Sequence, residues 1–435
     1  MRRQRRKIYG ILFFVILIGM IMTGMLRRHA TQKEGRNTTG EDACSTPREE
    51  VLETSEESGQ PGAVREDKRE KGYELPISDS EKTEATEECS KVMDLISEIY
   101  SRADKGEATN VILSDQTLFA MRDKIKETGH PVYTKVLYSK MQNYKQVDRF
   151  LKDCKDGKRA SVVVYMIRSD GGIGRSKYIF DGTDMYQFDA GAVWNENDQA
   201  EIGFFSHNRM KEWKYTENGW FCYELCVPEY PEVSEMVDGS CLIRVKPMSR
   251  ENYSMTKKFV SALGYQGHNL LCTNWDMNHM KDLDYNGLYE YLYEMKYKKK
   301  FDAEKYAEGI PKDQFEKLIM EYLPIKAEKI QEYASFNEKE KTYDWVRLGY
   351  YNYTLSFLGT SVPEVVKAKK NRNGTYTLTV SAVCEMVLCD DALITHELTV
   401  QIGKDGGFQY LGNKIREDEL RDLPKYQYRL DHKRG

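Results

Sequence analysis

Residues that could bind a metal ion gather in the segment DLDYNG, Asp282 to Gly287. It matches the first half of a calcium-binding loop, in which Asp282, Asp284 and Asn286 would supply oxygen ligands. The glutamate that closes such a loop would stand at the position of Tyr293. Asp282 and Asp284 also form the D-x-D pair with which many sugar-nucleotide transferases hold Mn²⁺. The alternative without a metal is that Asp284 or Asn286 caps the helix that follows.

A second set of potential metal ligands is His268, Asp276 and His279, although they lack the HExxH spacing of zinc hydrolases. His396 falls on the apolar side of a strand pattern, which predicts a hydrogen-bonded core histidine. His207 is predicted to lie in a loop. The sequence holds neither a G-x-S-x-G nor a C-x-x-C motif. We therefore assign no catalytic residue, and no cofactor beyond the Ca²⁺ or Mn²⁺ considered above.

The glycine-rich stretch RSDGGIGRSKYIF, residues 168 to 180, could bind a phosphate or form a turn. A phosphate loop needs a helix after it, because the helix N-terminus supplies the free N–H groups. Here the stretch runs into alternating aromatic residues at Tyr178 and Phe180, a pattern typical of a strand. The stretch is therefore predicted to be a β-hairpin turn. Asn218-Gly219, between two further alternating runs, predicts another hairpin.

The nine cysteines are too few for a disulfide scaffold in a chain of 435 residues. Cys222 and Cys226 have C-x3-C spacing, which differs from the x2 spacing of zinc knuckles. Buried thiols, or one or two disulfides, are the expected arrangement.

The N-terminus predicts a membrane anchor. The basic stub MRRQRRK, residues 1–7, precedes the uncharged segment Ile8–Leu26. As a helix this segment would be about 28 Å long, close to the hydrocarbon core of a bilayer. The basic lead places the N-terminus in the cytoplasm and the rest outside a single-pass cell membrane. Residues 27–88 are acidic and poor in large apolar side chains, which predicts a disordered tether.

Beyond the tether, the periodicity predicts an α+β fold with two units, 89–280 and 281–420, and a polar tail at 421–435. In each unit helices precede an antiparallel meander. The last strands, at 375–387, 393–402 and 408–415, alternate apolar with polar side chains. They predict a sheet covered on one side, as in cystatin-like or NTF2-like folds.

Five phrases in order suggest a family: ENGWFCYELCVP, GYQGHNLLCTNWD, LDYNGLYEYLY, FEKLIMEYLPI and THELTVQIGKDGGFQYLGNKI. Together with the anchor and tether they resemble a poorly characterised family of membrane-anchored exterior proteins of Gram-positive anaerobic bacteria. The resemblance covers roughly residues 90 to 415 and implies no activity and no functional residues.

Function is predicted mainly by what the sequence lacks. A formal net charge of −4 carries no nucleic-acid signature. The expected function is a non-enzymatic binding or cell-envelope module, anchored in the membrane through residues 8–26, with an exterior ligand or partner. The alternative is a type II membrane enzyme resembling metal-dependent glycosyltransferases and using Asp282 and Asp284.

Overall fold

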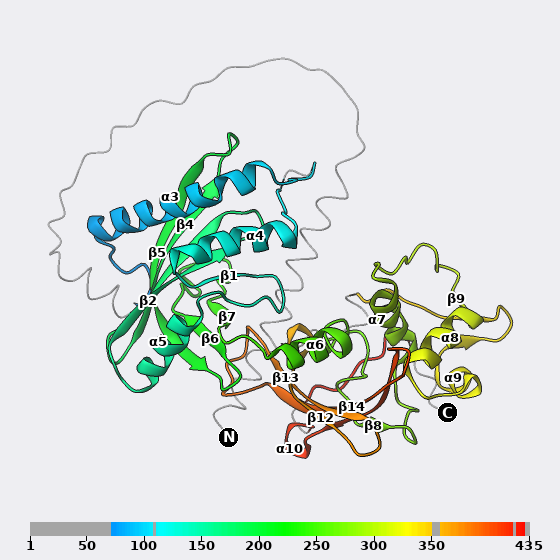
Figure 1. Cartoon of the computed structure of the whole chain (residues 1–435). Helices are drawn as coiled ribbons and strands as arrows, with labels where there is room; N and C mark the ends of the chain where they lie inside the picture. Colours follow the sequence, from blue (N-terminus) through cyan, green and yellow to red (C-terminus); the bar gives the residue numbers. More distant parts are fainter. Residues whose placement is uncertain (1–70, 108–109, 350–356, 421–422, 431–435) are drawn as a thin grey trace, which may run out of the picture. The chain divides into compact units, whose positions relative to one another are not determined.

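The computed structural model describes residues 71–107, 110–349, 357–420 and 423–430 (Figure 1). These residues form a mixed α+β fold, as the sequence predicts. The expected anchor at 8–26 and most of the expected tether lie outside the described residues. Within the described ranges, no helix combines the length and the apolar character needed to cross a membrane.

The first half of the fold is built on a seven-stranded sheet in the order β1-β2-β3-β4-β5-β6-β7. β1 is parallel to β2, and every later neighbour is antiparallel. The strands are β1 (Val132–Thr134), β2 (Ala160–Ile167), β3 (Ile173–Phe180), β4 (Met185–Trp194), β5 (Ala200–Tyr215), β6 (Trp220–Leu225) and β7 (Ser240–Arg244). Among the described residues, three α-helices come before β2, namely α3 (Asp79–Ser101), α4 (Asp115–Ile125) and α5 (Lys145–Lys155).

Helix α3 begins at Asp79, so residues 79–88 are helical although they were expected to belong to the disordered tether. Ser78 is its N-cap, and Ser78 and Glu81 form a reciprocal capping box. The first two turns of the helix are polar, so apolar periodicity does not reveal them. The S-x-x-E spacing is the local signal for this helix start.

Both faces of the seven-stranded sheet carry a hydrophobic core. On one face Ile167 and Phe188 pack in a cluster that also contains Met93 of α3 and Met121 of α4. On the other face Phe180 and other strand residues pack with Phe150 and Leu151 of α5. Along the central strands, the side chains that point to either face of the sheet are therefore buried.

The two predicted hairpins are present. Residues 168–172 connect the antiparallel strands β2 and β3, with Gly171 at φ +81°. Asn218-Gly219 lies between β5 and β6, with Gly219 at φ +89°. A Cβ atom on Gly219 would lie 2.1 Å from the Cβ of Lys246, so glycine is required at this turn.

The second sheet has the order β12-β13-β14-β15-β8, and all its neighbours are antiparallel. Its strands are β12 (Val362–Lys370), β13 (Tyr376–Val383), β14 (Ile394–Ile402), β15 (Phe408–Ile415) and β8 (Trp275–Asp276). Val380 and Leu398 are fully buried in one core with Leu292 and Phe315. Thr379, on the opposite face, is half-buried. The apolar face of this sheet is covered, as predicted, while on the other face Val383 at the end of β13 packs with Trp220 and Cys222.

Helices before and after β8 contribute to the second core. They are α6 (Arg250–Phe259), α7 (Tyr285–Tyr297), α8 (Lys312–Tyr322) and α9 (Ala327–Tyr333), and α10 (Glu417–Leu420) follows the sheet. A small sheet joins β9 (Ile310–Pro311), β10 (Phe336–Asn337) and β11 (Thr342–Tyr343) in the order β10-β11-β9.

Residues 250–280 pack with the second core, although the sequence groups them with the first unit. Phe259 of α6 and Trp275 of β8 belong to the same cluster as Leu398. β8 also pairs with β15, through Trp275 opposite Asn413. Only these contacts between distant segments assign α6 to the second sheet, because its own periodicity fits either partner.

The end of the chain is tied to α7 and is more than a polar tail. The hydroxyl of Tyr426 donates to Asp284 Oδ2 at 2.6 Å. Arg429 is 5% exposed and its Nη1 donates to Glu290 Oε2 at 2.6 Å. A charged side chain this deeply buried needs such a partner.

Candidate functional site

Asp284, the central residue of the predicted metal loop, caps helix α7. Its Oδ1 accepts the backbone N–H of Gly287 at 2.8 Å, which is the N-cap hydrogen bond. Its Oδ2 accepts the hydroxyl of Tyr426 at 2.6 Å. Both carboxylate oxygens are therefore engaged within the fold, and the capping alternative is confirmed.

The other two residues of that loop also serve the fold. The carbonyl of Asp282 accepts Asn269 Nδ2 at 2.6 Å and the Tyr428 hydroxyl at 2.7 Å. Asn286 Nδ2 donates to the carbonyl of Asp344 at 2.8 Å, and its Oδ1 accepts the N–H of Ser335 at 2.9 Å. In the part of the chain that the structure describes, no three His, Cys, Asp or Glu side chains form a potential metal site. Calcium or manganese binding by this loop stays a prediction.

The second potential metal set is divided between the interior and the surface. His268 is fully buried, with Nε2 3.1 Å from the carbonyl of Leu263 and Nδ1 accepting the N–H of Leu270 at 3.2 Å. Burial lowers the pKa of His268 to about 4. Asp276 and His279 pair with each other at 2.9 Å and are exposed.

The remaining histidines differ in how well the sequence places them. His396 is a core residue, as predicted: its Nδ1 lies 2.5 Å from Asn413 Oδ1 and its Nε2 lies 2.9 Å from the Tyr265 hydroxyl. Burial lowers the pKa of His396 to about 4. The loop prediction for His207 is wrong, because this residue lies within β5, opposite Phe188. Polar residues on both sides of His207 obscure the strand pattern.

Cysteines in the described residues are unpaired thiols, and most are buried. Cys222 and Cys226 are both buried, and burial raises the pKa of the Cys226 thiol. The eight described cysteines are therefore free thiols, five of them buried, as the buried-thiol alternative predicts.

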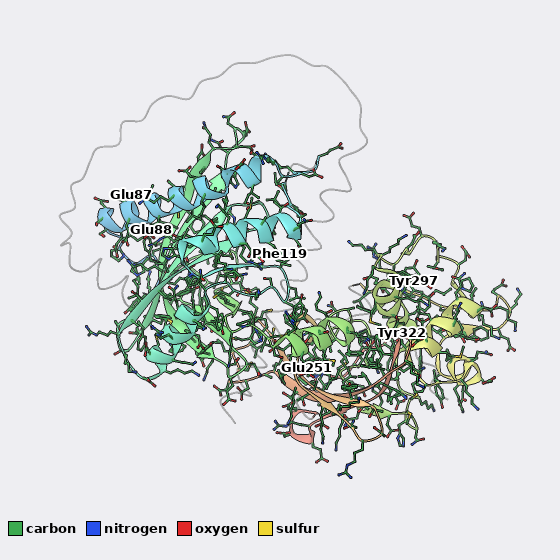
Figure 2. All side chains as sticks on the ribbon, in the orientation of Figure 1. Glu87, Glu88, Phe119, Glu251, Tyr297 and Tyr322 are labelled. Atoms are coloured by element: carbon green, nitrogen blue, oxygen red, sulfur yellow. The ribbon has the colours of Figure 1, made fainter. Side chains whose placement is uncertain are left out.

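A pocket of about 410 Å³ is the strongest candidate for a functional site, and its size is within the usual range for small-molecule sites. The elements that line it are α4, the loop after β1, the ends of β6 and β7, the start of α6, and β12 (Figure 2). Its side chains are mostly aromatic or cationic: Phe119, Arg122, Tyr138, Ser139, Lys140, Trp220, Arg244, Pro247, Met248, Arg250, Tyr253 and Glu364.

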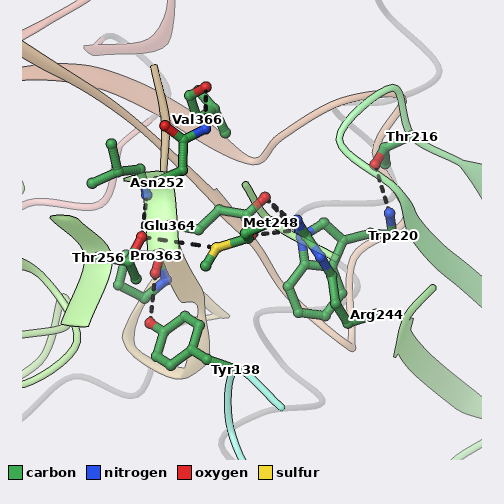
Figure 3. Close-up of polar contacts among 11 residues, drawn as sticks. Tyr138, Thr216, Trp220, Arg244, Met248, Asn252, Thr256, Pro363, Glu364 and Val366 are labelled. Atoms are coloured by element: carbon green, nitrogen blue, oxygen red, sulfur yellow. Dashed lines mark hydrogen bonds and ion pairs between the residues drawn. The ribbon is translucent and has the colours of Figure 1, made fainter. Parts of the chain in front are cut away.

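A β-bulge in β12 is held by α6 next to Glu364 (Figure 3). The pairing of β12 with β13 shifts between Val365 and Lys367. Two α6 side chains bond the backbone here: Asn252 Nδ2 donates to the carbonyl of Val366 at 2.8 Å, and Thr256 Oγ1 accepts the N–H of Val365 at 2.8 Å. Bulges redirect neighbouring side chains. The bulge and α6 thus fix the strand from which Glu364 faces the pocket.

Glu364 joins the second sheet to the first through an ion pair. Arg244 Nη1, at the end of β7, donates to both carboxylate oxygens of Glu364 at 2.7 and 2.5 Å. Trp220 Nε1, at the start of β6, donates to Glu364 Oε1 at 3.1 Å. Burial raises the pKa of Glu364, and the Arg244 guanidinium partly offsets this effect.

Tyr138 and Trp220 form aromatic walls of the pocket, and hydrogen bonds hold both residues in place. Tyr138 has φ +64°, which a bulky side chain rarely adopts, and its hydroxyl donates to the carbonyl of Pro363 at 2.5 Å. Trp220 is 6% exposed, and Arg244 lies over its ring at 5.0 Å. The backbone N–H of Trp220 donates to Thr216 Oγ1 in the turn before β6 at 3.0 Å.

Sequence reasoning did not identify this pocket. The local signal was a single charge within an apolar strand, Arg244 in CLIRV and Glu364 in VPEVV. A lone charge in such a strand needs a buried partner. The two residues are 120 positions apart, so nothing local shows that they pair.

Comparison with known proteins gives one match. No curated protein and no solved structure matches the chain. The family of unknown function DUF6070 matches residues 82–429, which include both sheets and every residue lining the pocket. The chain therefore belongs to the family of unknown function DUF6070.

Proposed function

We propose that this protein is a membrane-anchored binding module whose exterior part recognises a small molecule in the pocket without transforming it. The observation that carries the proposal is the pocket of about 410 Å³, in which Tyr138, Trp220 and Arg244 are held in place by hydrogen bonds to the fold. Such pre-organisation favours binding, because little side-chain freedom is lost when a ligand enters.

The reactive groups of the pocket support binding over catalysis. Glu364 supplies the carboxylate of the pocket, and both Arg244 and Trp220 donate hydrogen bonds to it. Ser139 Oγ lies 3.0 Å from Thr134 Oγ1 and 3.1 Å from the carbonyl of the same residue. A serine nucleophile needs a neighbouring base, which neither contact provides.

The anchoring part of the proposal rests on the sequence of residues 1–26. An uncharged segment at 8–26 follows five basic residues, which favours a cytoplasmic N-terminus. The test is surface labelling of intact cells with a membrane-impermeant amine reagent. We expect the full chain to be labelled and to stay in the membrane after alkaline extraction. A chain lacking 8–26 should be released. An unlabelled full chain in cells with intact membranes would reverse the orientation.

Ligand binding is tested by the melting temperature of the purified full chain in detergent with neutral, cationic and anionic small molecules. Ser139→Trp fills the pocket, whereas Ser97→Trp adds the same side chain on the exposed surface of α3. We expect at least one class to raise the melting temperature of the wild type and of Ser97→Trp, but not of Ser139→Trp. NMR spectra of the compound after incubation with the protein should show that it is chemically unchanged. The proposal is contradicted if a compound stabilises Ser139→Trp as much as the wild type, if the compound is chemically converted, or if no class of compound stabilises the wild type.

A further inference from the structure

We infer that the ligand of this pocket is a small organic anion that carries a carboxylate on an aromatic ring. This inference rests on the proposed function, since it names the ligand class of the same site. Three features of the lining support it: its uncompensated charge, an unused donor and its ring surfaces.

The pocket has an excess of positive charge. Four basic side chains line it, Arg122, Lys140, Arg244 and Arg250, against the single carboxylate of Glu364. Arg244 is neutralised by that carboxylate, and Arg122 pairs with Asp123 at 2.9 Å. Among the described residues, Lys140 and Arg250 form no ion pair, so an anion would find two unmatched cations.

Arg244 also holds a donor without a partner. Its Nε is buried and makes no hydrogen bond to any described residue. A buried guanidinium N–H left without an acceptor costs free energy, which a ligand carboxylate would recover once the Arg244 side chain turns this closed-off atom toward it. Helix α6 begins at Arg250 on the same wall, and the partial positive charge of its N-terminus acts in the same direction. Glu251 of that turn, labelled in Figure 2, opposes it but is not among the residues that line the pocket.

The aromatic walls favour a planar body on the anion. Phe119, Tyr138, Trp220 and Tyr253 all line the pocket. Arg122 lies over the Phe119 ring at 4.7 Å, so cation and ring surfaces alternate along the wall. Offset stacking on such rings contributes about 0.5–1.5 kcal/mol beyond area burial. An inorganic anion would leave these surfaces in contact with water.

The experiment compares four probes of graded chemistry on the full chain in detergent: benzoate, its neutral isostere benzamide, benzylamine and inorganic phosphate. Binding is measured by ligand-observed NMR and by quenching of tryptophan fluorescence, with Trp220→Phe to identify the signal of the pocket. We expect benzoate to bind at least about tenfold more tightly than the other three, because charge-assisted hydrogen bonds are among the strong ones.

Variants that each remove one positive charge test whether benzoate binds in this pocket. Lys140→Gln and Arg250→Gln should each weaken benzoate binding about three- to tenfold and leave benzamide binding unchanged. Lys145→Gln removes the same charge from an exposed lysine outside the pocket and should have no effect. Raising the salt concentration should weaken benzoate more than benzamide.

The outcomes separate this inference from the proposed function. If benzamide or benzylamine binds as tightly as benzoate, and Ser139→Trp abolishes binding, the module stands and the anionic ligand is wrong. If phosphate binds as tightly as benzoate while benzamide and benzylamine do not, the inference that the ligand carries an aromatic ring is wrong. If no probe binds while another compound class raises the melting temperature through the pocket, only the ligand class fails. If no compound of any class binds, the proposed function fails as well.

Discussion

The two large sheets solve the same packing problem differently. The seven-stranded sheet buries both faces, since Phe180 and Phe188 on its neighbouring strands β3 and β4 belong to different cores. The five-stranded sheet buries one face along its length, with Leu398 inside, whereas on the other side Thr379 is half-exposed and only the end of β13 is packed, at Val383. A sheet filled on both faces has no room for a ligand at its centre. The pocket accordingly uses its strand ends, the first residue of β6 and the last of β7.

The sharpest test of the two-sided sheet is truncation on both faces. Phe180→Ala and Phe188→Ala should each lower the free energy of unfolding by about 3–5 kcal/mol, because each leaves a cavity in a separate core. Urea denaturation of the full chain measures both. If one of the two variants is as stable as the wild type, only one face of the seven-stranded sheet is packed, and its contrast with the five-stranded sheet is lost. The double variant should be close to additive, since the side chains lie on opposite faces.

For the one-sided sheet, the two faces should respond unequally. Leu398→Ala should cost about 2–5 kcal/mol as a core truncation, because Leu398 is fully buried. Thr379→Ala, on the other face, should cost less than about 1 kcal/mol. The same denaturation experiment compares them. Equal losses would show that both faces of this sheet are packed, which would remove the contrast.

The buried His396 gives the apolar face of β14 a pH dependence. Its folded-state pKa of about 4 lies below the ordinary value of 6.5, so between these values the unfolded chain binds more protons. The stabilisation is present above pH 6.5 and is lost as the pH falls toward 4. From pH 7 to pH 5 this residue should account for about 2 kcal/mol of lost stability.

The variant His396→Gln isolates this effect. The difference in unfolding free energy between wild type and His396→Gln should shrink by that amount from pH 7 to pH 5. Thr399→Ser, a change on the same strand that involves no titratable group, provides the control and should show no such change. A pH-independent difference for His396→Gln would mean that water reaches this face.

A smaller effect than that of the core truncations is expected at Asp284. Asp284→Ala removes the N-cap of α7 and the acceptor of the Tyr426 hydroxyl, and should cost about 1–2 kcal/mol. If Asp284 is a cap and not a metal ligand, millimolar Ca²⁺ or Mn²⁺ should change the melting temperature of wild type and variant equally. A metal-dependent rise that disappears in Asp284→Ala would restore the metal-dependent transferase as the better hypothesis.

How far the sequence predicts this molecule depends on how local each feature is. The hairpins at Gly171 and Gly219, the one-sided sheet and the core position of His396 follow from period and turn chemistry, which neighbouring residues determine. The partner of α6 and the pairing of Arg244 with Glu364 depend on contacts between distant segments. The pocket belongs to this second class, because its walls come from both halves of the chain and none carries a recognisable motif.

The contacts that tie the end of the chain to α7 determine the order in which the molecule can be completed. Tyr426 reaches Asp284 across 142 positions, and Arg429 reaches Glu290 across 139. During synthesis the N-terminal part of a chain emerges first. The seven-stranded sheet has all its strands once residue 244 has been made. The cap of α7 acquires its second hydrogen bond only when Tyr426 has been made. A chain that stops before Tyr426 would therefore carry the strands of both sheets but lack the contacts that hold residues 426–429 against α7.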